Sequence, residues 1–498
     1  MSFKLNVIVN YTSQILVTLF GIVFIPQYID ILGPEGYGLI AFYTLLQSWF
    51  NLLDLGLTPT ISRETVRNIS GELDSNSYLK LYKVLNLFFL SSSLIITGLL
   101  VSNSGYFAEH WIKSEDIDVS IVAHCIAVMG IILSIRWLSS LNRGVLTGHE
   151  RIIWLSIYNL VFSFLKFVGV FIVLIFIDNT IVTFFYYQLA LSVIELLMLN
   201  YKVRTVMPIK SNNTINSKLD YKSIAKFSLS IALTGGIWVI VTQTDKLILS
   251  KLLSLEYFGY FTLAVLVANG VMILANPVGT ALMPRLANLF MKGNNEEVKS
   301  VISYSTRVTV TLAGSAALVL IACSKHILFA WTNDINIANK VYLVLKLYAF
   351  GNLFLAFSAY SYYIQYGLGN VKYHLIGNLI FVVILVPLIG YFATSYGAIG
   401  AASVWGTLSF FYFVFWVSWV NHKIFPNFQI SWILKDILYV IYPSSFITIA
   451  YICFSSEPTS RLNSFLQIFA FGIIVLSLNL IRSKLIKLPI FYQRSKSE

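Results

Sequence analysis

The sequence predicts an all-α polytopic membrane protein with about fourteen transmembrane helices, and three observations lead to this fold class. Hydrophobic residues make up 57% of the 498 residues and charged residues only 11%, whereas a soluble domain carries about 25% charged residues. The apolar runs are continuous, as in "LVFSFLKFVGVFIVLIFI", and approach the ~20 residues that a helix needs to cross a bilayer. Barrel strands would alternate apolar and polar residues instead. The third observation is that lysine and arginine lie mostly on one side of the predicted spans.

The spans follow from the apolar runs in chain order. We expect them at about 8–29, 37–58, 84–103, 121–141, 152–177, 180–201, 224–250, 255–282, 301–322, 341–366, 373–393, 396–420, 437–455 and 463–481. The first run is not followed by a small-residue cleavage site, so we interpret it as a retained span and not as a signal peptide.

The basic residues set the orientation. With the N-terminus in the cytoplasm, most of the 34 lysines and arginines fall in cytoplasmic segments. The opposite side holds Lys113, Lys251, Lys325, Lys340 and Arg461, and four cations lie inside spans: Arg136, Lys166, Lys246 and Lys346. This asymmetry is the positive-inside pattern. It predicts a multi-pass protein with cytoplasmic N- and C-termini, and it explains the net charge of +12 without a nucleic-acid partner.

The three cysteines, Cys125, Cys323 and Cys453, lie in or beside apolar runs and lack the spacing of metal ligands. We interpret them as small buried hydrophobes. We expect no metal, no catalytic residue and no cofactor, and the sequence leaves H⁺ or Na⁺ coupling open.

An internal repeat organises the chain. Three residues of "DILGPEGYGLIAF" recur at a constant offset in "KLLSLEYFGYFTL": Leu32, Glu35 and Gly38 align with Leu253, Glu256 and Gly259. With one residue of slip, "TPTISR" (58–63) then aligns with "TALMPR" (280–285). Each repeat holds six spans, an even number, so both copies enter the membrane in the same direction, as parallel repeats do.

The repeat predicts two parallel six-helix lobes around a central cavity, with two extra C-terminal helices. We assign 1–203 to the N-lobe, 204–222 to a cytoplasmic loop between the lobes, 223–422 to the C-lobe, and 423–498 to the last two spans and a basic cytoplasmic tail.

The stretches "LGPEGYGLIAF", "DLGLTPTISRE", "TDKLILSKLLSLEYFGYFTLA" and "MPRLANL" resemble those of the polysaccharide repeat-unit (O-antigen and capsule) flippases of the multidrug/oligosaccharidyl-lipid/polysaccharide exporter superfamily. The resemblance covers nearly the whole chain in its span pattern. It implies a transporter of the bacterial cytoplasmic (inner) membrane. Such a transporter flips a polyprenyl-diphosphate-linked oligosaccharide to the outer leaflet by alternating access, among membrane lipids and beside polysaccharide polymerase machinery.

Charges inside the spans are costly and usually face protein or water. Lys166 lies near the centre of the fifth span, too deep to reach an interface easily, and has two interpretations: a cavity-facing role or an internal ion pair. Arg136 lies nearer the cytoplasmic end of the fourth span, where it can also snorkel to headgroups. Together they can attract a diphosphate, for which Arg supplies a bidentate fork and Lys a point charge.

Four further residues are candidates for coupling or gating. Asp245 and Lys246 form a pair that the resemblance makes a family feature, and Asp245 either pairs locally or takes up a proton or cation. Asp54 and Glu195 lie near the cytoplasmic ends of their spans, where each can pair with Arg136 or with loop cations.

The remaining candidates concern substrate contact at the surface and in the first span. Arg63 and Arg285 end the repeated hairpins at the inner surface and bind either phospholipid headgroups or the substrate diphosphate. Lys346 lies one turn inside the outer end of its span, which favours snorkelling. Asn10 and Gln14 share one helix face through their i, i+4 spacing, and either bind sugars or join helices.

Three other functions are compatible with a membrane protein of many spans. A cation-coupled drug antiporter of the same superfamily shares the fold but needs acidic residues in its cavity, whereas the deep charge of the first lobe is Lys166. A lipid II-type flippase is a third possibility. A membrane-embedded glycan polymerase or ligase needs a site for acid–base or metal chemistry, and His110 and His326 in the outer loops show no catalytic spacing. We therefore expect no enzyme.

Overall fold

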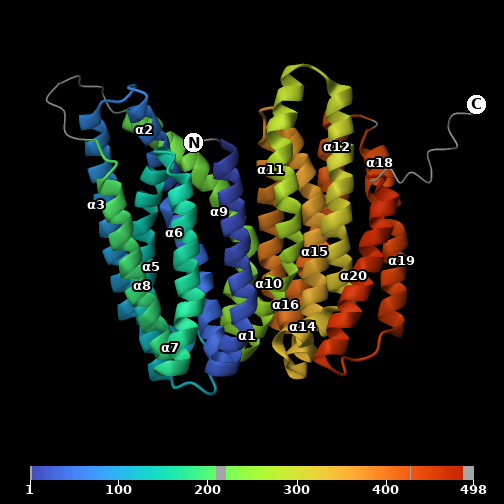
Figure 1. The fold of residues 1–498 in the computed structure, drawn as a ribbon, viewed down its shortest axis with the longest axis horizontal. Coiled ribbons are helices and arrows are strands. Elements are labelled where there is room, and N and C mark those ends of the chain that lie inside the picture. Colours follow the sequence, from blue (N-terminus) through green and yellow to red (C-terminus); the bar gives the residue numbers. More distant parts are fainter. Residues whose placement is uncertain (1–2, 209–219, 427, 486–498) are drawn as a thin grey trace, which may run out of the picture. The chain divides into compact units, whose positions relative to one another are not determined.

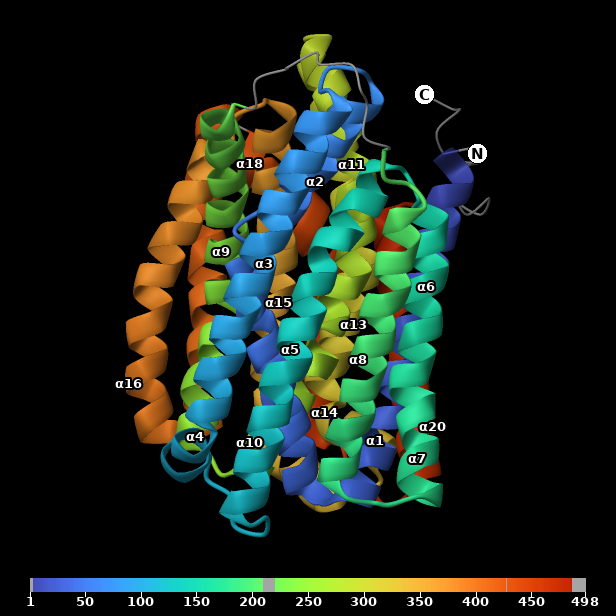
Figure 2. The ribbon, with the colours of Figure 1, turned by 90° about the vertical axis from the view of Figure 1, so that its left-hand side faces the viewer.

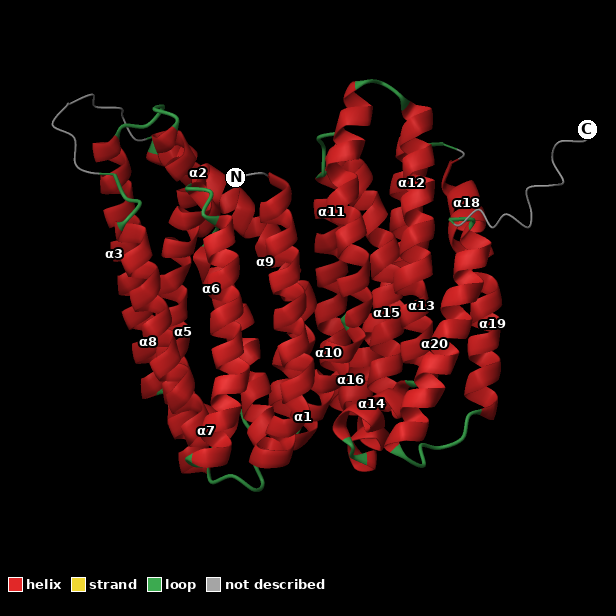
Figure 3. Ribbon diagram, viewed as in Figure 1, coloured by secondary structure: helices red, strands yellow, loops and turns green. Residues whose placement is uncertain are grey.

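The computed structural model describes residues 3–208, 220–426 and 428–485, and these residues form helices and loops without a β-strand (Figure 3). Contacts between Cα atoms divide the chain into two compact units. Unit 1 is Met1–Gly259 and unit 2 is Tyr260–Glu498.

Unit 1 is built from long helices joined by short turns (Figure 1). Its elements are α1 (Phe3–Phe50), the 3-10 helix η1 (Asn51–Asp54), α2 (Leu57–Ile69), α3 (Ser75–Ser102), α4 (Ser104–His110), α5 (Val119–Gly148), α6 (Ile152–Phe164), the π-helix η2 (Leu165–Gly169), α7 (Val170–Phe176), α8 (Ile181–Arg204), α9 (Tyr221–Leu252) and the first residues of α10 (Leu255–Ala268).

Unit 2 holds the rest of α10 and the helices that follow it. They are α11 (Gly270–Met291), α12 (Asn295–Thr309), π-helix η3 (Val310–Gly314), α13 (Ser315–Ala322), α14 (Ser324–Thr332), α15 (Ile335–Gly367), α16 (Lys372–Phe411), π-helix η4 (Tyr412–Val417), α17 (Ser418–Ile424), α18 (Phe428–Trp432), π-helix η5 (Ile433–Leu438), α19 (Tyr439–Phe454) and α20 (Arg461–Ser483).

Among the described residues, twelve helices are long and apolar enough to cross a membrane. Two of them, Thr12–Asp54 and Lys372–Ile424, are interrupted by a glycine with non-helical dihedral angles, Gly33 and Gly397 respectively. Each of these two covers two of the segments expected from the sequence. The prediction of an all-α polytopic membrane protein is therefore confirmed, and the count of fourteen is approximate.

Unit 1 includes α9, which the sequence repeat assigns to the second lobe. A unit defined by contacts and a lobe defined by a repeat are different divisions of the chain. The lobe boundaries therefore stay a prediction.

The hairpin within α1 explains why the charged residue Glu35 lies between two apolar segments. Gly33 has φ 76° and ψ 169°, a region that essentially only glycine adopts, and Pro34 follows it. The Glu35 side chain is buried. Its carboxylate accepts hydrogen bonds from the backbone N–H groups of residues 115–117 at 2.6, 3.0 and 3.0 Å. Glu35 thus holds the loop between α4 and α5.

The same end of unit 1 contains the start of α10. A Cβ atom at Gly38 would overlap the carbonyl oxygen of Leu255, so only glycine permits this close approach. The Leu255 N–H also donates to the Lys113 carbonyl at 2.7 Å. The hairpin of α1, the α4–α5 loop and α10 therefore meet here.

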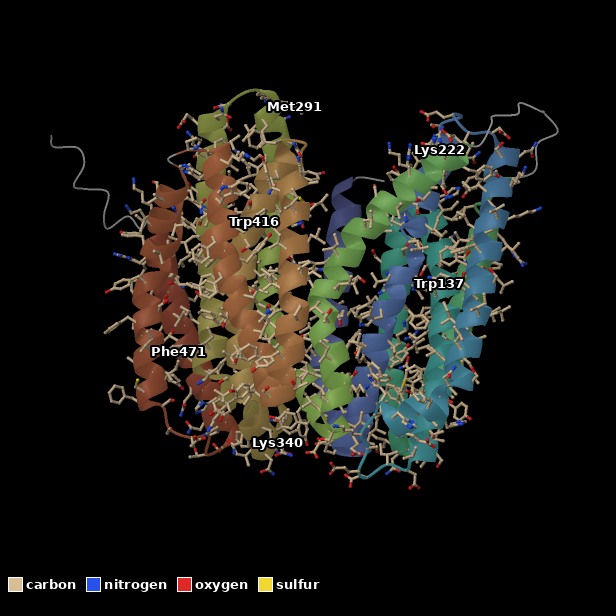
Figure 4. The ribbon with its side chains drawn as sticks, turned by 180° about the vertical axis from the view of Figure 1, so that it is seen from behind. Trp137, Lys222, Met291, Lys340, Trp416 and Phe471 are labelled. Atoms are coloured by element: carbon tan, nitrogen blue, oxygen red, sulfur yellow. The ribbon has the colours of Figure 1, made fainter. Side chains whose placement is uncertain are left out.

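The core of unit 1 is centred on α5, which runs between α3 and α8 (Figure 2). Trp137 lies about halfway along these helices (Figure 4) and is 4% exposed. Its ring packs against Phe89 of α3, with ring centroids 4.7 Å apart. This packing fixes the position of α5 at Trp137, the residue that follows Arg136 in the same helix.

The last helices pack onto the remainder of unit 2 through buried polar bonds. Asn479 of α20 donates to Ser315 Oγ at 2.8 Å and accepts from Ser444 Oγ of α19 at 2.6 Å. Arg307 of α12 lies 2.7 Å from the buried carboxylate of Asp436 in η5. The C-terminal helices are thereby joined to α12 and α13.

The surfaces of both units are rich in apolar side chains, as lipid contact requires. Phe176 of α7 is 79% exposed and Phe454 of α19 is 88% exposed. Met291 and Lys340 mark opposite ends of unit 2 (Figure 4). The interpretation of the cysteines as buried hydrophobes is right for Cys125 and Cys323 and wrong for Cys453, whose side chain is exposed.

Candidate functional site

Three charged side chains meet between the helices of unit 1. Lys166 of η2 places its Nζ 2.6 Å from Oε1 of Glu195 on α8. Arg136 of α5 places its Nε 3.5 Å from Oε2 of the same carboxylate. Two cations therefore share one anion, and the cluster carries one uncompensated positive charge.

The three side chains differ in their solvent exposure. The Glu195 side chain is 3% exposed, that of Arg136 is 12% exposed, and that of Lys166 is 25% exposed. A buried carboxylate is costly unless it is paired, and the two cations supply that pairing. Lys166 is the most accessible charge of the cluster.

Arg136 is held by two further side chains. Its Nη1 donates to the hydroxyl of Tyr43 on α1, and its Nη2 donates to Oε1 of Gln188 on α8 at 2.8 Å. Hydrogen bonds of this kind from a charged group are stronger than neutral ones. The guanidinium is thus fixed in orientation, which a bidentate contact requires.

Lys166 stands in a π-helical turn, a deviation that occurs frequently at functional sites. The turn interrupts the helix between α6 and α7. Carbonyl groups of this turn accept hydrogen bonds from side chains of α1 and α8, including the Gln188 amide at 3.2 Å. The local backbone is therefore held by its neighbours as well as by its own helix.

The structure shows which of the predicted residues come together. Of the two carboxylates expected to pair with Arg136 or with loop cations, Glu195 contacts Arg136. Asp54 instead accepts from the N–H and the hydroxyl of Thr58, at 3.2 and 2.5 Å, at the start of α2. Glu195 also pairs with Lys166, so Lys166 takes part in an internal ion pair, and its functional role stays a prediction.

The charged pair of α9 makes a second, separate contact in unit 1. Asp245 is 1% exposed, and Nζ of Lys246 lies 3.5 Å from its Oδ1. The same ammonium donates to the Thr242 carbonyl at 2.6 Å.

The other predicted residues of unit 1 lie on helices that do not carry the three charged side chains of the cluster. Arg63 of α2 stacks over the ring of Phe227, 4.5 Å from its centroid. Gln14 lies on the first arm of α1 with an exposed side chain. The side chain of Asn10 is outside the part of the chain whose side chains the structure describes.

In unit 2, the two predicted cations make weaker contacts. Arg285 lies 3.7 Å from the carboxylate of Glu297, and both side chains are exposed. Lys346 lies over the ring of Tyr342 at 5.4 Å, and Lys325 lies over the same ring at 4.8 Å.

Sequence reasoning missed Tyr43 and Gln188. Gln188 carried a usable signal, because an amide in "TFFYYQLALSV" is as unusual in an apolar segment as Glu195 seven positions later. Tyr43 carried none, because tyrosine is common throughout this chain and its position gives no partner.

Comparisons with known proteins place the chain in a family. A family model described as "Polysaccharide biosynthesis protein" matches residues 3–290, and the MatE model matches residues 231–392. Candidate O-antigen transporters of Shigella flexneri and Salmonella typhi are 22% and 24% identical to it. These matches cover 75% and 68% of this chain and 87% and 78% of the relatives.

A shorter match is to human multidrug and toxin extrusion protein 1, 30% identical over 27% of this chain and 25% of that protein. Among solved structures, the lipid II flippase MurJ in an inward closed conformation has a TM-score of 0.72 at 17% identity, covering 96% of this chain and 98% of MurJ. An inward-facing multidrug transporter of the MATE family, in the MOP superfamily, has a TM-score of 0.65 at 17% identity, covering 82% and 96%. All of these relatives are transporters or flippases and not enzymes. The chain belongs to the polysaccharide biosynthesis protein family and has the fold of the MOP-superfamily transporters.

Proposed function

We propose that this protein flips a polyprenyl-diphosphate-linked oligosaccharide repeat unit from the cytoplasmic to the outer leaflet for surface polysaccharide assembly. Family membership supports transport for polysaccharide biosynthesis. The relatives from Shigella and Salmonella support an O-antigen or similar surface polymer as the destination.

The observation that carries the proposal is the cluster of Arg136, Lys166 and Glu195. A diphosphate is a multiply charged anion, and a guanidinium fork with a neighbouring ammonium is a suitable receptor for it. Glu195 keeps both cations paired while no substrate is bound, which lowers the cost of burying them. An arriving diphosphate then exchanges with the carboxylate as the partner of Lys166, the most exposed of the three.

The proposed setting is a bacterial cytoplasmic membrane, with both termini in the cytoplasm as the distribution of lysine and arginine predicts. The partners are the lipid-linked glycan, membrane lipids and the polymerase machinery that uses the flipped unit. Asp245 is the candidate group for H⁺ or Na⁺ coupling, because it is a buried carboxylate outside the cluster.

One observation favours a second function. The MatE match covers residues 231–392 and includes Asp245, and a cation-coupled drug antiporter needs a buried acidic group for its cationic substrate. The cluster in unit 1 argues against this function, because its cations outnumber its carboxylates. Drug and cation efflux assays test it directly.

The flippase is tested by deleting the gene and quantifying polyprenyl-diphosphate-linked oligosaccharides by mass spectrometry of extracted lipids. We expect complete single repeat units to accumulate and surface polymer to be lost. The wild-type gene restores polymer, whereas Lys166→Ala and Arg136→Ala do not. Lys80→Ala, an exposed lysine of α3 in the same unit, is the matched control and restores it. A flat lipid pool with normal polymer contradicts the proposal.

A further inference from the structure

We infer that Gln188 is a positioning residue that sets the Lys166 ammonium relative to the Arg136 guanidinium, so that the pair matches a diphosphate and not a monophosphate. This inference rests on the proposed function. It concerns the π-helical turn that carries Lys166 and the side chains that donate hydrogen bonds to its carbonyl groups.

The backbone carbonyl groups of the turn are bound by side chains of neighbouring helices. In a π-helical turn the hydrogen bonds span five residues, so the register of carbonyl partners changes locally. Three consecutive carbonyls here each accept a side-chain hydrogen bond. Leu165 accepts from the Tyr187 hydroxyl at 3.0 Å, Lys166 from the Gln188 amide at 3.2 Å, and Phe167 from the Tyr28 hydroxyl at 2.7 Å.

These donors come from two helices, Tyr28 from α1 and the other two from α8. The turn therefore keeps its form through tertiary contacts. If it relaxed to an ordinary α-helix, a change of one residue in register would rotate the Lys166 side chain by about 100° around the helix axis. The ammonium would then point away from Glu195.

Gln188 differs from the two tyrosines because it also contacts the other cation. Its Oε1 accepts from Arg136 Nη2 at 2.8 Å, while its Nε2 donates to the Lys166 carbonyl at 3.2 Å. A guanidinium only donates and a carbonyl only accepts, so the amide can satisfy both groups in one orientation alone. The side chain is 5% exposed and is held in place at both ends.

The Gln188 amide also affects which phosphate ligand the two cations bind. One amide links the guanidinium of the first cation to the backbone of the second, and so limits how far the two charges move apart. A diphosphate presents two phosphoryl groups that need two cations at a set separation. A monophosphate needs only one. Loss of Gln188 should therefore weaken diphosphate binding selectively.

The test is a double-mutant cycle on the purified full-length protein in nanodiscs, with farnesyl diphosphate and farnesyl monophosphate as probes in a calorimetric titration. Gln188→Leu is expected to weaken farnesyl diphosphate binding by about fivefold to tenfold, the size of one or two lost hydrogen bonds. In the Lys166→Ala background the same substitution should change affinity less than about twofold, because coupled effects vanish when the partner is absent. Monophosphate affinity should change little in either background.

Two further variants keep the test decisive if Gln188→Leu does not fold. Tyr28→Phe and Tyr187→Phe each remove one bond to the same turn and should also lower the diphosphate-to-monophosphate affinity ratio. Tyr82→Phe is the matched control, since its hydroxyl donates to Asn142 at 3.1 Å elsewhere in unit 1, and it should leave the ratio unchanged. Equal losses by Gln188→Leu with and without Lys166 would overturn the positioning role alone. Failure of the wild-type protein to bind farnesyl diphosphate would overturn the proposed function as well.

Discussion

The Glu195 carboxylate is the anionic member of the charged cluster in unit 1. Among the described residues, it is the one carboxylate that contacts both Arg136 and Lys166, and it is buried. Removing one partner of a buried ion pair leaves the other charges without compensation, which costs more than the pair itself contributes. The Glu195 carboxylate therefore lowers the cost of burying Arg136 and Lys166.

Glu195→Gln should lower the free energy of unfolding by about 3 kcal/mol, because Arg136 and Lys166 are left without their anion. Thermal unfolding of the purified protein measures this. Glu457→Gln is the control, because Lys325 and Glu457 are also 2.6 Å apart but the carboxylate is 71% exposed. It should cost less than about 1 kcal/mol. Equal losses in the two variants would contradict the account.

His326 of α14 supplies a pH-dependent prediction. It lies outside the membrane-spanning helices and is 3% exposed, and burial lowers the pKa of its imidazole below the ordinary value of 6.5. The unfolded chain binds this proton near pH 6.5 and the folded chain does not, so stability should fall as pH drops below about 6.5. His326→Gln should reduce that loss in melting curves between pH 7.5 and 5.5. An unchanged loss would show that other groups cause it.

At the scale of elements, the hairpin in α1 shows how one backbone position shapes a helix. Gly33 has φ 76°, and a Cβ atom there would meet nothing within 4 Å. A substitution at Gly33 is therefore opposed by the backbone conformation and not by crowding. Gly98 of α3 has the same open space without a positive φ, which makes the two glycines a matched pair.

Gly33→Ala should destabilise the protein by about 1–3 kcal/mol, the cost of a residue held in a sparsely populated backbone region. Gly98→Ala should be neutral or stabilising by up to about 1 kcal/mol, because alanine favours the helix. The two changes in melting temperature should thus have opposite signs or differ clearly. Equal destabilisation by both would contradict the backbone argument.

The C-terminal helices give a second element-scale prediction. Asn479→Leu removes the bonds to Ser315 and Ser444 and should cost about 1–2 kcal/mol, since interhelical hydrogen bonds in membrane proteins are individually modest. Asn463→Leu, at the start of the same helix, removes only an exposed hydrogen bond to Thr459 Oγ1 and should have little effect. Melting curves of the two variants make the comparison, and no difference between them would argue against the role of Asn479.

The sequence predicts elements better than contacts, for physical reasons. Length and apolarity determine a span, so the all-helical fold followed from local composition. Ionisable residues inside spans identified Arg136, Lys166 and Glu195. The π-helical turn at Lys166 was not predictable, because it depends on Tyr28, which is distant in the sequence. The sequence also did not identify Thr58 as the partner of Asp54, because Thr58 and Arg136 are both chemically acceptable partners.

For the whole protein, the proposed function requires a large polar group to move through an apolar layer. The described residues offer apolar surfaces that suit a lipid, and the cluster of Arg136, Lys166 and Glu195 lies inside unit 1. The cluster is small compared with the proposed substrate, so in this proposal it binds the shared diphosphate and leaves the glycan to other surfaces. This predicts tolerance for the sugar and strict dependence on the diphosphate.

The most direct test of this account is a flipping assay in proteoliposomes with a fluorescent polyprenyl-diphosphate-linked oligosaccharide. Wild-type protein should move the lipid between leaflets, and Lys80→Ala should match it. Lys166→Ala should be slower by at least about tenfold, because a charge-assisted contact contributes about 1.5–3 kcal/mol. If Lys166→Ala flips the lipid at the wild-type rate, or if wild-type protein is no faster than empty liposomes, the account is contradicted.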